Sequence, residues 1–156
     1  TNMKSLFSGK TNFNLDISKW DVSNVTDISF MFKDASAFNQ DISNWDISNV
    51  RWLHGTFRGA SSFNQNLGSW NVSNVINMDN MFYGASSFNQ DISNWNVSKV
   101  STMIGVFLQA HSFNQNINSW DVDKVEHCYN FLNGSALNNS NIPKFTKCNL
   151  LCPTNP

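Results

Sequence analysis

A repeat of 25 residues runs through almost the whole chain and limits its possible folds more than any other feature. Aligning the sequence with itself at this interval brings aromatic residues into register. One column of the repeat holds Phe13, Phe38, Phe63, Phe88 and Phe113, and another holds Trp20, Trp45, Trp70, Trp95 and Trp120. A unit of this length cannot bury its apolar side alone, so we expect successive units to stack and share one continuous core.

The boundaries of the units follow from the same register. We expect the repeat to occupy residues 1–142, with units near 3–27, 28–52, 53–77, 78–102 and 103–127 and the start of a sixth. Residues 143–156 lose the pattern and carry Pro143 and Pro153. Because the last unit of a stack meets water on its outer side, we expect this segment to be a degraded last repeat that forms a C-terminal cap or tail.

The apolar spacing changes within each unit. Trp20 and Val22 flank one polar residue, and this W-x-V alternation predicts a short parallel β-strand. A short helix is predicted further along by the i, i+3, i+4, i+7 spacing of Ile28, Met31, Phe32 and Ala35. The glycine column of Gly59, Gly84 and Gly134 stands where that helix would end. The fold expected is therefore an α/β repeat, a right-handed solenoid of the leucine-rich-repeat type with about six coils.

Two long motifs carry a family resemblance. The segments MFKDASAFNQDISNWDISNV at 31–50 and MFYGASSFNQDISNWNVSKV at 81–100 resemble the BspA-like leucine-rich-repeat surface proteins, whose 25-residue units also fill a domain family named after mycoplasma lipoproteins. The resemblance implies a cell-surface or secreted protein that acts in adhesion or binding without known catalysis. The chain departs from the standard leucine-rich repeat by placing Val25 and its equivalents where an asparagine ladder usually stands.

The constant polar columns have a structural interpretation. A side-chain amide can donate and accept at once, so a stacked amide can pair the backbone of its own loop and of the neighbouring coil. We expect such a ladder at Asn39, Asn64, Asn89 and Asn114, with Trp45, Trp70 and Trp95 as constant core residues. A role of the amides in contacting a ligand is the alternative.

Two further columns of Asp, Asn and Ser follow each tryptophan. They begin with Asp21 and Ser23 and would form a regular polar surface, which suggests a glycan-binding face as an alternative to a merely soluble one. Calcium is disfavoured because Ca²⁺ needs six to eight oxygens that converge in one loop.

Function is more readily sought where the repeats differ. Arg51, Trp52, His54 and Arg58 cluster in one unit, and Trp and Arg are enriched in binding hot spots. The speculative binding residues are these four together with Ile76 and Tyr83. The expected partner is a protein or a host surface molecule; a glycan ligand and a purely architectural spacer are the alternatives. An exposed Trp in a drifting repeat needs no functional explanation, and this alternative stays open.

Charge and motif content exclude other classes of function. The net charge of −1 and the charged fraction of 13% give no basic field for nucleic acid, and no apolar run is long enough to cross a membrane. His54, His111 and His127 stand in three different columns, and no catalytic or metal-binding constellation recurs. We therefore expect no enzymatic activity, no cofactor and no metal site.

The cysteines and the N-terminus give weaker expectations. Cys128 stands in a column of apolar residues, which predicts a buried thiol, whereas Cys148 and Cys152 are close enough for a local disulfide in an oxidising compartment. The chain begins TNMKSLF, without an initiator Met or a signal peptide. We expect a mature product or an excised fragment whose signal or anchor lies outside this segment.

Overall fold

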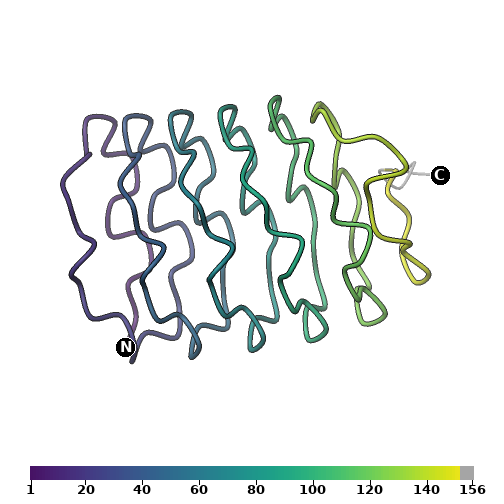
Figure 1. The fold of residues 1–156 in the computed structure, drawn as a ribbon, viewed down its shortest axis with the longest axis horizontal. Coiled ribbons are helices and arrows are strands. Elements are labelled where there is room, and N and C mark those ends of the chain that lie inside the picture. Colours follow the sequence, from purple (N-terminus) through teal and green to yellow (C-terminus); the bar gives the residue numbers. More distant parts are fainter. Residues whose placement is uncertain (152–156) are drawn as a thin grey trace.

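The computed structural model describes residues 1–151, which form a stack of coils of similar size (Figure 1). The chain advances from one end of the stack to the other, so the N-terminus and the last described residues lie at opposite ends. Parallel β-bridges join neighbouring coils at one point of each coil. We number the coils from these bridge residues, which gives coils 1 to 5 as 2–26, 27–51, 52–76, 77–101 and 102–126, and a last coil, coil 6, that begins at His127.

The expected α/β solenoid with a strand and a helix in each unit is wrong. No helix occurs in residues 1–151, and the only β structure there is a row of isolated bridges. These bridges lie beyond the W-x-V segment that was predicted to be the strand. They join Asn2, Asp27, Trp52, Asn77, Thr102 and His127 in sequence. The chain is thus a repeat protein that lacks the regular secondary structure of a leucine-rich-repeat solenoid.

Left-handed backbone conformations explain why the predicted helix does not form. Within the segment 28–35, Phe30 and Asp34 have φ angles of 58°, and a residue in this region ends a right-handed helix. The same two positions are left-handed in every coil. One column is Ser5, Phe30, Gly55, Asn80, Gly105 and Asn130, and the other is Gly9, Asp34, Gly59, Gly84, Gln109 and Gly134. The glycines that were predicted to cap a helix instead occupy turns.

Hydrogen bonds between coils replace those of the helix. The backbone N–H groups of residues 28, 30, 32 and 34 donate to the carbonyls of residues 52, 54, 56 and 58 in the next coil, over 2.7–3.3 Å. The intervening N–H groups close turns within the coil; Met31, for example, donates to Ile28. Alternate peptide groups therefore serve the stack and the coil, which satisfies the backbone without helix or sheet.

The apolar columns nevertheless point inward as their conservation within the repeat suggests. Ile28, Met31, Phe32 and Ala35, the four residues of the predicted helix face, are all fully buried. Two columns of phenylalanine rings run along the stack. Rings of the column Phe7, Phe32, Phe57, Phe82 and Phe107 follow one another at 5.6–5.7 Å. Each stacks on a ring of the Phe13 column in its own coil at 3.8–4.1 Å.

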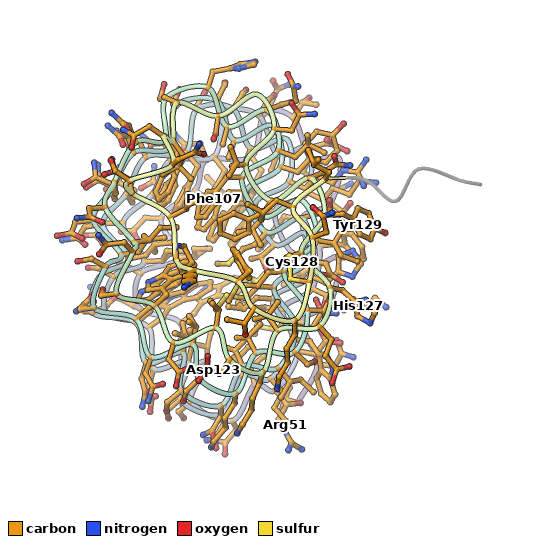
Figure 2. All side chains as sticks on the ribbon, turned by 90° about the vertical axis from the view of Figure 1, so that its right-hand side faces the viewer. Arg51, Phe107, Asp123, His127, Cys128 and Tyr129 are labelled. Carbon is orange, nitrogen blue, oxygen red and sulfur yellow. A yellow bond between two sulfur atoms is a disulfide. The ribbon has the colours of Figure 1, made fainter. Side chains whose placement is uncertain are left out.

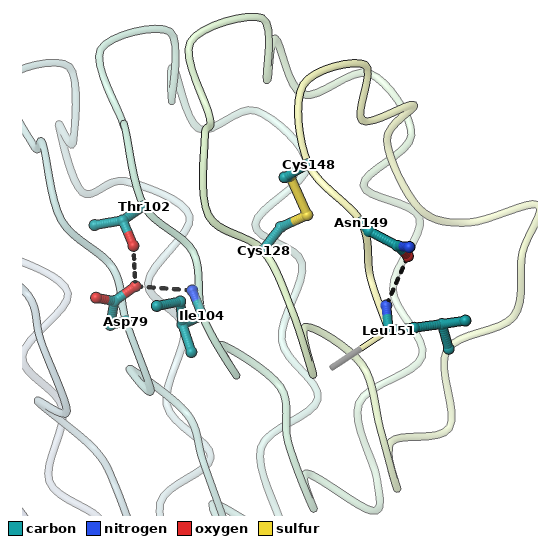
Figure 3. Close-up of a disulfide and its surroundings, with 7 residues drawn as sticks. All are labelled: Asp79, Thr102, Ile104, Cys128, Cys148, Asn149 and Leu151. Atoms are coloured by element: carbon teal, nitrogen blue, oxygen red, sulfur yellow. Dashed lines mark hydrogen bonds between the residues drawn. A yellow bond between two sulfur atoms is a disulfide. The ribbon is translucent and has the colours of Figure 1, made fainter. Parts of the chain in front are cut away.

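The last coil is shorter than the others and carries a disulfide. The backbone N–H of Phe30 and of its equivalents Gly55, Asn80 and Gly105 donates to a carbonyl 24 residues later in the chain. Asn130, the next equivalent, donates to Leu150, only 20 residues later. Cys128 is buried as expected, yet it is not a free thiol, because it forms a disulfide with Cys148 (Figure 3). The bridge considered between Cys148 and Cys152 involves a residue outside the described ones. Within residues 1–151, no helix is long and apolar enough to cross a membrane.

Candidate functional site

The constant amides are engaged with the backbone of the stack. The side-chain oxygen of Asn39 accepts the N–H of Asn64 at 2.9 Å and the Nε2 of Gln65 at 3.0 Å. Asn14, Asn64 and Asn89 accept the corresponding pairs of bonds from the next coil, so the ladder extends to the N–H of Asn114. These side chains supply the bonds that hold one return loop to the next.

The tryptophan column also connects coils. The indole Nε1 groups of Trp45, Trp70 and Trp95 donate to carbonyls 28 residues earlier, those of Ile17, Ile42 and Leu67. All three indoles are almost completely buried. Their uniform use across the stack is a structural role.

The Asp, Asn and Ser columns close turns rather than present free oxygens. The Oδ1 of Asp21 accepts both the N–H and the hydroxyl of Ser23, which forms an Asx-turn. Asp46, Asn71, Asn96 and Asp121 accept the equivalent backbone bonds. Bonds from serine hydroxyls and N–H groups hold the pKa values of Asp16, Asp21, Asp41, Asp46 and Asp91 below the ordinary value. One oxygen of each of these side chains is therefore committed to its own loop.

The variable residues lie on one side of the stack, which we call the variable face. It carries the non-buried residues of the stretch that follows each Val25 equivalent, including Arg51, Trp52, His54, Arg58, Ile76 and Tyr83. Figure 2 looks along the stack and shows His127 and Tyr129 projecting on this side, with Arg51 at the lower edge of the molecule. Arg51 is exposed, and Trp52 has an exposed fraction of 38%. The two are the accessible members of the predicted cluster.

His54, predicted as a binding residue, is half-buried and not fully exposed. Its ring lies 4.5 Å from that of Phe30, centroid to centroid. Phe30 occupies this position because the next coil has Gly55 beneath it, where an added Cβ would lie 2.5 Å from a ring carbon. Burial lowers the pKa of His54 from its ordinary value, so the ring is neutral at pH 7. His54 is therefore a half-buried aromatic wall.

Arg58 and Tyr83 form a pair across two coils. The guanidinium carbon of Arg58 lies 4.8 Å from the centroid of the Tyr83 ring, a cation–π contact. Ile76 is half-buried, and its backbone donates to Arg51 and accepts from Ser101. The structure thus divides the six predicted residues into an exposed pair, an aromatic wall, a cation–π pair and an aliphatic neighbour of Arg51.

A shallow hollow of about 300 Å³ lies beside Trp52 on the variable face. It is lined by Lys4, Asp27, Ser29, Phe30, Trp52, His54 and Asn77. Of these residues, only Trp52 and His54 are among the binding residues predicted from the sequence. The repeat register contained the missing signal, since residues 25 apart are neighbours in the stack: Asp27 and Asn77 flank Trp52, and Lys4 and Ser29 precede His54.

Asp79 stabilises the face next to this hollow. Its carboxylate is 9% exposed and accepts bonds from the hydroxyl of Thr102 and the N–H of Ile104 (Figure 3), and also from the Asn77 amide. A buried carboxylate with three donors is satisfied and fixes its neighbours. Asn77, which lines the hollow, is therefore held in place.

Side chains that could bind a metal ion do not cluster in residues 1–151. No three His, Cys, Asp or Glu side chains of that range lie close enough to hold a metal ion. Of the histidines, His54 packs against Phe30 with the two rings tilted by 46°, and the Nδ1 of His111 lies 2.8 Å from the carbonyl of Gly134.

Comparison with known proteins identifies a repeat family. No curated protein and no solved structure matches the chain. One family model, described as "Mycoplasma protein of unknown function, DUF285", matches it twice, over residues 1–78 and 44–145. The two matches overlap and together cover most of the repeat. The chain therefore belongs to this mycoplasma-type family of repeat proteins of unknown function.

Proposed function

We propose that this chain is a non-catalytic recognition module that binds a partner protein through its variable face, in an adhesion role at a cell surface or in a secreted protein. The observation that carries the proposal is the exposure of Trp52 beside the exposed Arg51. Trp and Arg are among the residue types most enriched in binding hot spots.

The distribution of variation supports this choice of surface. The ladder amides, the indoles and the Asx-turn residues recur because every coil needs their hydrogen bonds. On the variable face, the coils differ in charge and size while the backbone stays the same. A surface that the fold leaves free can be adapted to a partner. The resemblance of the repeat motif to BspA-like surface proteins supports the location.

Two alternatives predict different behaviour. A glycan-binding face on the Asp, Asn and Ser columns would work through their remaining oxygens, since the first oxygen is bonded within the turn. A purely architectural spacer would bind nothing on either face. Loss of ligand binding on replacing Asp46 and Asp21 by Asn would favour the first, and an inert protein would favour the second.

Binding to a panel of purified surface proteins, measured by biolayer interferometry, tests the proposal. We expect the double variant Arg51→Ala/Trp52→Ala to lose at least about tenfold in affinity, because hot-spot truncations cost 2 kcal/mol or more. The matched control is Glu126→Ala/His127→Ala, which changes the same two columns three coils further on. Unchanged affinity in the first variant, or no binding of any protein, would contradict the proposal.

A further inference from the structure

The hollow beside Trp52 owes its shape to one small residue. In the column Lys4, Ser29, His54, Asp79, Ile104 and Tyr129, Ser29 is the smallest side chain and lies between two large ones. Lys4 borders the hollow in the coil before and His54 in the coil after. Ser29 is 5% exposed, and its hydroxyl forms no hydrogen bond within residues 1–151. The floor of the hollow is thus a hydroxyl that remains available to a ligand.

The walls combine aromatic and polar groups. The partly exposed indole of Trp52 lines the hollow together with the neighbouring rings of Phe30 and His54, which are tilted against each other. Asp27 contributes a carboxylate of which one oxygen accepts the N–H of Ser29, so the second oxygen is free of that turn. Aromatic walls with a few convergent polar groups are the usual composition of a small-molecule site.

The charges at the hollow balance one another. Lys4 carries a positive charge, Asp27 a negative one, and His54 is neutral because burial lowers its pKa. Neither a cation nor an anion is favoured by this lining. A ligand that donates and accepts hydrogen bonds from the same ring fits better, because it can meet the lysine, the hydroxyl and the carboxylate together.

We propose that this hollow binds one pyranose unit of a neutral glycan, with its C–H face against Trp52 and its hydroxyls on Asp27, Ser29 and Lys4. The volume of about 300 Å³ lies at the lower end of the range for ligand sites and suits a single ring. This ligand class and these residues go beyond the proposed recognition of a protein, which uses the outward side of Arg51 and Trp52.

The repeat supplies substitutions that the fold already accepts. Asp27→Asn removes the carboxylate but keeps the turn, since Asn2 and Asn77 close the same turn in their coils. Trp52→Asn introduces an asparagine, the residue that stands in the same column one coil later, at Asn77. Ser29→Ile fills the hollow with the residue that stands at Ile104. Arg51→Ser, which has its counterpart in Ser101, is the control outside the hollow.

The experiment is saturation-transfer-difference NMR with the methyl glycosides of neutral hexoses, N-acetylhexosamines and a hexuronic acid at millimolar concentration, followed by titration of any glycoside that binds. We expect binding by the unmodified chain and by Arg51→Ser, and at least about tenfold weaker binding by Asp27→Asn, Trp52→Asn and Ser29→Ile. Unchanged thermal unfolding of each variant will show that the fold is kept.

Three results would overturn the inference. The unmodified chain could bind none of the glycosides, all three hollow variants could bind as well as the unmodified chain, or the hollow could prefer a uronic acid glycoside over every neutral one. The outcome is separable from that of the proposed protein recognition. Arg51→Ala alone tests the protein contact without altering the hollow, whereas Ser29→Ile blocks the hollow and leaves the outward residues in place.

Discussion

The indole Nε1 of Trp45 donates a hydrogen bond of 3.1 Å to the backbone carbonyl of Ile17, which lies 28 residues earlier in the preceding coil. Trp70, Trp95 and Trp120 repeat this contact with their own preceding coils. The side chain therefore fills the core with its rings and pairs a buried carbonyl with its single donor. A phenylalanine could do the first but not the second.

Trp70→Phe is expected to destabilise the chain by about 1–3 kcal/mol, because it leaves the carbonyl of Ile42 without its donor and removes part of a buried ring. Trp20→Phe is the matched control. Trp20 lies in coil 1, where its side chain is 40% exposed. Chemical denaturation of both variants measures the difference, and equal losses at the two positions would show that the indole bond contributes nothing.

Asn80 tests the left-handed positions that replace the predicted helix. Its φ angle is 55°, a conformation that Gly and Asn tolerate and β-branched residues do not. We expect Asn80→Val to lose about 1–2 kcal/mol of stability or more and Asn80→Gly to be close to neutral. A helix at this position would give the reverse order, because glycine is then the worse residue. The order of the two unfolding midpoints decides between these backbone conformations.

The sequence predicted the buried residues of each coil better than it predicted their backbone. Ile28, Met31, Phe32 and Ala35 are buried as the helical spacing requires, yet their chain forms successive turns. The spacing reports which side chains face the core, and a series of turns can place the same ones there. Glycine and asparagine at the positions of Phe30 and Asp34 in other coils were the signal of left-handed turns.

The candidate site was predictable in part for a related reason. Trp52 and Arg51 stand out because their columns vary, and the structure places both at the surface. Their neighbours come from adjacent coils, so a search confined to one unit misses Asp27 and Asn77. The 25-residue repeat did not predict the pairing of Cys128 with Cys148. The two cysteines are 20 residues apart, and they become neighbours only because the last coil is shortened.

The disulfide is expected to hold the shortened last coil against the stack. It closes a loop with a sequence separation of 20 residues, and loops of this size correspond to about 3 kcal/mol in the chain-entropy account. Reduction should therefore lower the thermal midpoint of the unmodified chain. The variant Cys128→Ala/Cys148→Ala should have the lower thermal midpoint already without reductant, and adding reductant should not lower it further. Equal midpoints before and after reduction of the unmodified chain would contradict the expectation.

His54 should make stability depend on pH below neutrality. Burial lowers its pKa below the ordinary 6.5, Arg58 and Lys4 act in the same direction, and Asp79 and Asp27 oppose them. In the window between the folded pKa and 6.5, the unfolded chain binds more protons than the folded one. Stability therefore rises with pH through this window and is lost as the pH falls from 6.5 towards the folded pKa.

The variant His54→Tyr tests this pH dependence. It introduces the residue that stands in the same column at Tyr129, keeps an aromatic ring beside Phe30 and removes the titrating group. Denaturation midpoints measured from pH 5 to 7.5 should fall on acidification more steeply for the unmodified chain than for His54→Tyr. Parallel curves would show that His54 is not the group responsible.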